Sequence, residues 1–331
     1  PQPKIPTTSI PKTQLEGKKT RRQILILGGL GGSGFVLASL TKYLWDYISA
    51  QPQQKIVTQV FTTVKVNNTG KRISRTEVKA KVMTENLDDG VSLEMVKIPG
   101  GRFRMGSLGT EAGRLDGEGP QHDVDVPEFF MAKYAVTQAQ WQAVMGNNPS
   151  GFKGASRPVE RVSWNDATAF CQKLSQITGK KYSLPSESQW EYACRAGTTT
   201  PFSFGETIRS ELVNYDGNYP YANAPKGKYR AQTTDVGIFL PNSFGLYDMH
   251  GNVYEWCQDV WHDDYNGAPT DGSAWEIEGY SDSNRRVCHG GSWYVDPMRC
   301  RSANRNNYNS DEADNNNIGF RLVSFPPRTP E

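Results

Sequence analysis

Two carboxylates and a glycine turn within one short run are the first residues of this chain that could bind a metal ion. Asp248 and Glu255 stand seven positions apart in the run FGLYDMHGNVYEW, residues 244–256. Hard cations such as calcium take several oxygen ligands, and a short loop can supply them from carboxylates and carbonyls. With the carbonyls near Gly251 and Val253, four ligands are available. A buried turn whose carboxylates only cap neighbouring amides is the alternative.

A second candidate ion site lies at Asn214 and Tyr215, in the segment NYDGN. Oxygen-bearing side chains alternate there around a glycine. The segment is shorter than an EF-hand loop and lacks the closing glutamate of that motif. Plain turn residues remain the alternative interpretation.

Thiols and imidazoles are few. The four histidines form no His-x-x-x-His pair, and the chain contains neither a Gly-x-Ser-x-Gly elbow nor a phosphate-binding Walker loop. The odd number of cysteines leaves at least one thiol free or bonded to another chain. Cys171 and Cys257 are expected to be small buried hydrophobes. The remaining cysteines are Cys194, Cys288 and Cys300.

Three helices are predicted to frame these residues, at 137–145, 165–177 and 186–194, the first with Thr137 as its N-cap. Elsewhere short β segments alternate with Gly, Asn, Asp and Pro, so we expect an α+β domain with small twisted sheets and much irregular loop. The side chains expected to face inward are Trp141, Val144 and Met145 in the first helix and Ala169, Phe170, Leu174 and Ile177 in the second.

Charge is distributed unevenly along the chain. Residues 1–90 carry 14 Lys/Arg and 6 Asp/Glu, whereas residues 91–331 carry 23 and 29. The globular part is therefore acidic and has no basic stripe, which argues against nucleic acid as a partner.

The basic residues at the N-terminus flank an apolar run. KKTRR at 18–22 precedes an uncharged run at 24–40, which resembles a twin-arginine signal-anchor. We expect a polar basic linker at 1–20, a signal-anchor or short transmembrane segment at 21–45 and a linker at 46–90. The membrane is then a partner through residues 24–45, and the main domain, 91–326 with a tail at 327–331, lies outside the cytoplasm. For Val60–Val66 a strand or hairpin is an equal alternative to a tether.

Six segments in a fixed order identify a family resemblance. They are IPGGRFRMGS (98–107), AVTQAQW (135–141), RPVERVSWNDA (157–167), YSLPSESQWEYACRAG (182–197), GGSW (290–293) and GFRL (319–322), together with the 244–256 run. This order resembles the formylglycine-generating enzymes, or sulfatase-modifying factors, whose domain is a variant of the C-type lectin fold.

The resemblance implies both cofactors and their ligands. It implies structural calcium at Asn214, Tyr215 and groups about fourteen residues on, where no carboxylate stands near Lys228. Calcium at Asp248, Gly251, Val253 and Glu255 is expected from the residues of that loop themselves. The oxidases hold copper with two cysteines, the first three residues after the serine of the GGS motif. That position is Val295 here, which argues against copper and against formylglycine generation. Cys300 with Cys288 remains an alternative copper pair, and a Cys194–Cys300 disulfide is implied by analogy.

The Asn-rich C-terminal hairpin also resembles variable proteins of diversity-generating retroelements, which randomise Asn-coded positions on this scaffold to make a binding face. Tyrosine suits such a face because it is large, rigid and amphipathic. We therefore expect a non-catalytic domain that binds a protein or another ligand. The alternatives are a copper oxidase acting on a target cysteine and a sensory module of a larger signalling protein. The expected ligand-binding residues are Trp293, Tyr294, Val295, Asp296, Met298, Arg299, Asn304, Asn306, Tyr308, Ser310 and Asp311.

Overall fold

The computed structural model describes residues 56–87, 90–276 and 284–325. The expected basic linker, the signal-anchor and the tail lie outside these residues. The chain divides into residues 1–53 and 54–331, and the description concerns the second part. Within the described ranges, none of the helices combines the length and the apolar character that a membrane crossing requires.

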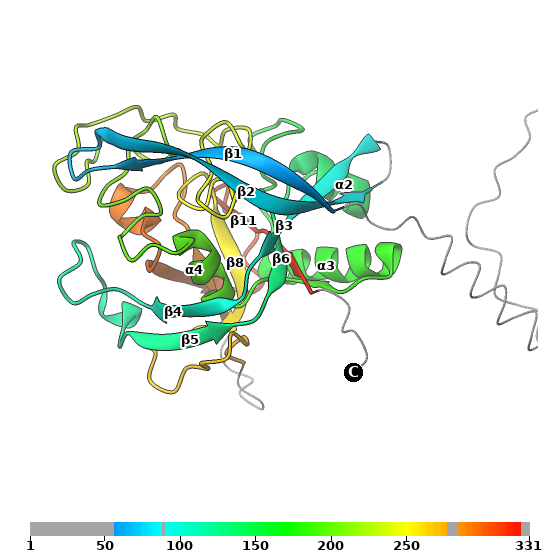
Figure 1. The fold of residues 1–331 in the computed structure, drawn as a ribbon. Helices are drawn as coiled ribbons and strands as arrows, with labels where there is room; N and C mark the ends of the chain where they lie inside the picture. The colour runs from blue at the N-terminus through cyan, green and yellow to red at the C-terminus, as the bar shows by residue number, and fades with distance from the viewer. Residues whose placement is uncertain (1–55, 88–89, 277–283, 326–331) are drawn as a thin grey trace, which may run out of the picture. The chain divides into compact units, whose positions relative to one another are not determined.

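The largest sheet is antiparallel throughout and has the strand order β1-β2-β3-β6-β12-β7 (Figure 1). A second sheet has the order β10-β9-β8-β11, in which β8 and β11 are parallel, and β4 pairs with β5. The strands are β1 (Ile56–Val66), β2 (Arg72–Asn86), β3 (Ser92–Ile98), β4 (Gly101–Met105), β5 (His122–Val126), β6 (Phe129–Ala132), β7 (Tyr182–Ser183), β8 (Tyr254–Val260), β9 (Arg285–His289), β10 (Arg305–Asn309), β11 (Ile318–Gly319) and β12 (Val323–Ser324).

The domain begins earlier than the sequence indicated. The segment expected as a linker up to residue 90 forms the β1-β2 hairpin from Ile56 to Asn86, and β2 continues the sheet onto β3. Buried and exposed side chains alternate along both strands, as in a half-buried hairpin: Phe61 and Val82 are buried, whereas their neighbours Val60 and Lys81 face solvent. Of the two interpretations of Val60–Val66, the hairpin is confirmed.

Three helices lie at the predicted positions: α2 (Gln138–Met145), α3 (Trp164–Thr178) and α4 (Glu187–Arg195). Thr137, Ser163 and Ser186 each close a capping box. Trp141, Val144, Phe170 and Leu174 are buried as predicted, and Met145 packs partly buried against the core. The prediction was wrong for Ala169 and Ile177, which are exposed on the outer face of α3.

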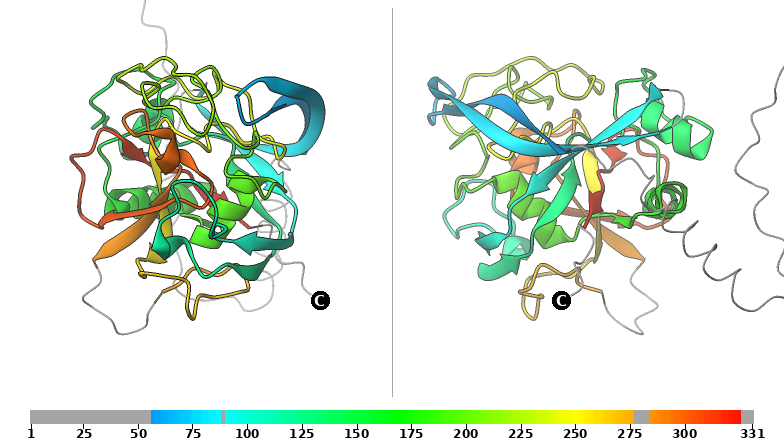
Figure 2. Two further views of the ribbon diagram at one scale, coloured as in Figure 1. Left: turned by 90° about the vertical axis from the view of Figure 1, so that its left-hand side faces the viewer. Right: turned by 45° about the vertical axis from the view of Figure 1, so that its right-hand side comes forward.

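Helix α4 lies inside the domain. It packs against β4, β5, β8 and β9, and all nine of its residues are buried. The short helices η2 (Asp116–Glu118) and η3 (Pro297–Cys300) are 3₁₀ turns. Between α4 and β8, residues 196–253 run as irregular loops over one side of the molecule (Figure 2). The expected α+β class with few helices and much loop is confirmed.

Three buried arginines join these elements. Arg301 contacts Glu118 of η2 at 2.6 and 2.7 Å. Arg305 contacts Glu187 of α4 at 2.6 and 2.9 Å. Arg321 and Glu255 make the third pair. Arg301 also donates to a second glutamate, Glu111. We call these three arginines and their glutamate partners the arginine belt. Buried charges are tolerated only when paired in this way.

Candidate functional site

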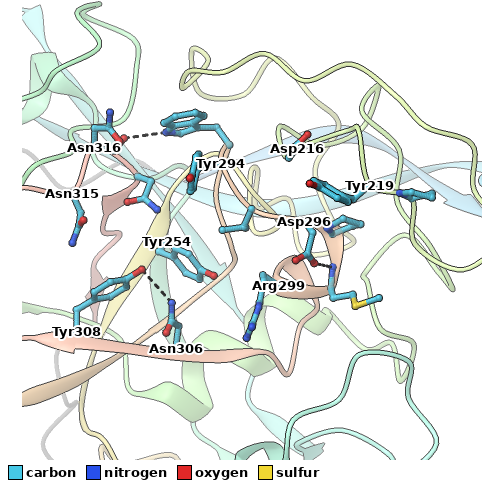
Figure 3. A pocket seen from close by; sticks show the side chains of 16 residues that line it. Asp216, Tyr219, Tyr254, Tyr294, Asp296, Arg299, Asn306, Tyr308, Asn315 and Asn316 are labelled. Atoms are coloured by element: carbon cyan, nitrogen blue, oxygen red, sulfur yellow. Dashed lines mark hydrogen bonds between the residues drawn. The ribbon is translucent and has the colours of Figure 1, made fainter.

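An open pocket of about 1070 Å³ lies where β8, β10 and the turn around η3 meet (Figure 3). Segments distant in sequence build its wall. The lining residues are Asp216, Tyr219 and Pro220 from one loop, Tyr254 of β8, Trp293–Arg299, Asn306 and Tyr308 of β10, and Asn315–Asn317.

The turn that carries Trp293–Arg299 is shaped by two glycines with left-handed backbone, Gly290 (φ 93°) and Gly291 (φ 70°). A Cβ on Gly291 would lie 2.5 Å from Cys300 Sγ, so only glycine fits this close approach. Asp296 then caps η3 by accepting a hydrogen bond from Met298 N at 2.8 Å. The turn is therefore rigid at both of its ends.

Trp293 anchors the wall. Its Nε1 donates to the Asn316 carbonyl at 3.1 Å, which ties the turn to the Asn-rich segment. Its ring makes an edge-to-face contact with Phe152, with the ring centroids 5.3 Å apart. Tyr294, by contrast, is 61% exposed and meets Trp293 only edge-on. One aromatic ring is thus structural and the next is available to a ligand.

Eight of the predicted binding residues line the pocket: Trp293, Tyr294, Val295, Asp296, Met298, Arg299, Asn306 and Tyr308. The other three lie elsewhere. Asn304 is buried and donates to Glu118, and Ser310 is largely buried with its hydroxyl on Asn284. Asp311 is exposed and accepts a hydrogen bond from Asn284 at 3.3 Å. The sequence predicted that all eleven residues form one binding face, whereas in the structure eight line the pocket and three lie outside it.

Sequence reasoning missed Asp216, Tyr219, Tyr254 and Asn315–Asn317 as lining residues. Signals were present for most of them. Asp216 lies in the segment predicted as an ion site, Tyr254 in the 244–256 run, and the asparagines in the Asn-rich hairpin. Spacing could not reveal that these segments meet, because the contacts join residues far apart in the chain.

Comparison with known proteins identifies the scaffold. Residues 79–325 match the sulfatase-modifying factor enzyme 1-like domain. The chain belongs to this family. The formylglycine-generating enzyme of Thermomonospora curvata is 28% identical, with 70% of this chain and 93% of that protein covered.

Two solved structures are similar to this family member. PvdO from Pseudomonas aeruginosa is 36% identical, with a TM-score of 0.62 and coverage of 70% of this chain and 94% of that one. Treponema denticola variable protein 1 is 27% identical, with a TM-score of 0.62 and coverage of 73% and 98%. The C-type lectin variant expected from the sequence motifs is thereby confirmed.

The carboxylates of the predicted calcium loop, Asp248 and Glu255, already accept hydrogen bonds from the protein. Both oxygens of Glu255 accept hydrogen bonds from Arg321, at 2.6 and 2.8 Å, and one also accepts from Trp190 at 2.7 Å. Asp248 accepts from Gly237 N, and burial raises its pKa to about 6. Among the described residues, no group of three or more His, Cys, Asp or Glu could hold one metal ion. Arg321 thus already matches the charge of Glu255, and calcium at the loop with Asp248, Gly251 and Val253 stays a prediction.

The second implied calcium site fits better. Asn214 Oδ1 is a buried acceptor without a partner in the described part of the chain, and Tyr215 beside it is also buried. An unpaired buried oxygen calls for an ion or a water molecule. Lys228, near the expected carboxylate position, is exposed. Asn214 and Tyr215 would hold the ion, which would only stabilise loops, and calcium here stays a prediction.

The cysteines do not assemble the oxidase thiol pair of the family. Val295 lines the pocket, whereas Cys300 is fully buried, and burial raises the pKa of its thiol. Cys288 lies in β9, in a different core cluster from Cys300. Cys194 and Cys300 are both free thiols, so the disulfide implied by analogy is not formed. His250 lies by both, donating from Nδ1 to the Cys300 carbonyl at 2.7 Å, with Nε2 3.7 Å from Cys194 Sγ.

Proposed function

We propose that this family member is a non-catalytic binding domain whose ligand occupies the pocket around Trp293–Arg299. One observation carries the proposal. A large open pocket lies at the position where the oxidases of the family would carry their first copper-binding cysteine, and Val295 stands there instead. Its wall combines rigid aromatic rings with asparagine amides, which are the side chains that adaptable binding surfaces use.

The alternative function, copper-dependent oxidation, requires a pair of accessible thiolates that this pocket lacks. A copper site of the oxidase kind needs two thiolates. Cys300 is 0% exposed, and burial favours its protonated form. The pocket thus offers polar and aromatic contacts without a reactive sulfur.

The experiment compares the full chain with its Val295→Cys variant. Each is titrated with Cu(I) and then incubated with a cysteine-containing peptide, which is analysed by mass spectrometry. We expect neither protein to bind copper stoichiometrically and the peptide to stay unchanged, because Val295→Cys restores only one accessible thiol. Stoichiometric Cu(I) with conversion of the peptide cysteine to an aldehyde in the unmodified chain would overturn the proposal.

A diversified binding face is the finer form of this proposal. The similarity to Treponema denticola variable protein 1 supports it, as do Asn306 and Asn315–Asn317 in the wall. Sequencing the gene from many isolates tests it. Substitutions concentrated at the codons of pocket residues, with Arg301 and Arg305 unchanged, would support diversification, and evenly spread substitutions would contradict it.

A further inference from the structure

The pocket contains an arginine without a partner. Arg299 lies in η3 and lines the pocket, and its guanidinium has no ion pair or hydrogen bond within the ranges that the structure describes. A guanidinium is always charged and presents its donors as a planar fork that matches a carboxylate. Unlike Arg301, which is saturated by two glutamates, Arg299 keeps all of these donors free.

A tyrosine hydroxyl is unpartnered beside it. Tyr254 is 1% exposed and lines the pocket, and its hydroxyl has no hydrogen-bond partner among the described residues. A buried tyrosine normally satisfies its hydroxyl. The hydroxyl itself is not fully buried, so it faces the open pocket, where water or a ligand can be its partner.

These donors lie close enough to influence one another. Burial raises the pKa of Tyr308 to about 12, and the positive charge of Arg299 acts in the opposite direction on both Tyr308 and Tyr254. Asn306 Nδ2 lies 3.3 Å from the Tyr308 hydroxyl. Figure 3 shows Arg299, Tyr254, Asn306 and Tyr308 around the same part of the pocket. The guanidinium, the two phenols and the amide form one donor-rich wall.

Acidic residues limit the charge that a ligand can bring. Asp216 and Asp296 also line the pocket, and in Figure 3 they lie on the side away from Tyr308. Asp296 is used to cap η3 and makes no ion pair with Arg299 within the described residues. A single carboxylate can be matched by Arg299, whereas a phosphate dianion would meet about twice the repulsion from the two aspartates that a monoanion meets. Tyr294, which is 61% exposed, offers a ring face to a flat neighbour of that carboxylate.

We propose that the pocket binds a ligand through a singly charged carboxylate held by Arg299, with the hydroxyl of Tyr254 and the amide of Asn306 as further donors. This inference rests on the proposed function and adds the chemical class of the ligand. The carboxylate belongs to a molecule with a planar or aromatic group next to it, which stacks against Tyr294.

The test uses three probes that share one ring: benzoate, neutral benzamide and doubly charged phenyl phosphate. The full chain and three variants are titrated while the methyl signal of Met298, a pocket residue, is followed by NMR. The signal is assigned with Met298→Leu. The variants are Arg299→Met, Tyr254→Phe and the matched control Arg75→Met, which changes an exposed arginine of β2 outside the pocket.

We expect benzoate to bind more tightly than benzamide or phenyl phosphate. Arg299→Met should weaken benzoate binding at least about tenfold, and Tyr254→Phe about threefold to tenfold, with Arg75→Met unchanged. Equal benzoate binding by Arg299→Met and Arg75→Met, with the Met298 signal still shifting, would overturn the carboxylate inference alone. Phenyl phosphate binding more tightly than benzoate would also overturn it. No shift with any probe would count against the binding pocket itself.

Discussion

Arg299 and Arg301 stand two positions apart, yet the fold uses them in opposite ways. Arg301 is 0% exposed and donates to Glu111, Glu118 and the Gly113 carbonyl. Arg299 lines the pocket and has no side-chain partner among the described residues. The same contrast separates the arginine belt, where every guanidinium is paired, from the pocket, where Arg299 and the Tyr254 hydroxyl have no protein partner among the described residues. Paired groups hold the fold, and unpaired groups at a concave surface are those that a ligand can use.

Removing a member of the belt should have the largest effect on stability. Arg301→Met leaves Glu118 and Glu111 buried without their cation, and we expect a loss of about 3–5 kcal/mol in the free energy of unfolding. Urea denaturation of the variant measures it. Arg299→Met is the matched control and should change stability by less than about 0.5 kcal/mol. Equal losses in the two variants would remove the distinction between belt and pocket.

The buried histidine beneath the pocket turn should make stability depend on pH. Burial lowers the pKa of His250 to about 4, from an ordinary value of 6.5. Between these values the folded chain binds fewer protons than the unfolded chain. The contribution of His250 is therefore complete above about pH 6.5 and is lost as the pH falls towards 4, by on the order of 3 kcal/mol.

Comparison of the unmodified chain with His250→Gln isolates the pH-dependent contribution of His250. Burial also raises the pKa values of Asp248 and Asp259, so these groups change stability with pH in the opposite direction, but they do so equally in both proteins. Unfolding is measured by urea at about pH 7 and about pH 4.5. The stability difference between the two proteins should shrink at the lower pH. A difference independent of pH would show that His250 is protonated in the folded state.

The dependence of stability on calcium tests the predicted ion site at Asn214. If Asn214 holds an ion, calcium in hundredfold excess over its dissociation constant should stabilise the chain by about 2.7 kcal/mol relative to chelator. Thermal unfolding with calcium or EGTA measures the effect. Asn214→Ala should abolish the response. Asn266→Ala, a surface asparagine outside both predicted ion sites, is the control and should retain it. An unchanged response in Asn214→Ala would contradict an ion at this site.

Tyr294 should give the smallest effect on stability. It is 61% exposed, so Tyr294→Ala should change the free energy of unfolding by no more than about 0.5 kcal/mol. Benzoate binding should nevertheless weaken, since an aromatic face of the pocket is lost. Leu108→Ala, which removes another exposed apolar side chain away from the pocket, should affect neither property. A large loss of stability in Tyr294→Ala would place this ring among the structural residues.

Local signals predicted much of this molecule. Thr137 and apolar residues at helical spacing located α2 and α3, and ordered motifs such as GGSW located the family scaffold. Eight of the residues proposed from the C-terminal segments line the pocket because they occupy one rigid turn and one strand.

Residue spacing along the sequence could not predict contacts between side chains that are far apart in the chain. Arg301 and Asn304 look like parts of a polar Asn-rich loop, but Glu118, more than 180 positions earlier, makes them core residues. Glu255 looks like a calcium ligand, and only the approach of Arg321 shows that its charge is already matched. Ala169 and Ile177 were misplaced because an apolar side chain on a helix does not by itself say which face is covered.

The most direct measurement is made on one variant, Arg299→Met, in two assays: urea unfolding and benzoate titration. We expect the free energy of unfolding of Arg299→Met to lie within about 0.5 kcal/mol of that of the unmodified chain, and its benzoate binding to be weakened at least about tenfold. A stability loss like that of Arg301→Met, or unchanged benzoate binding, would contradict the division between arginine belt and ligand pocket.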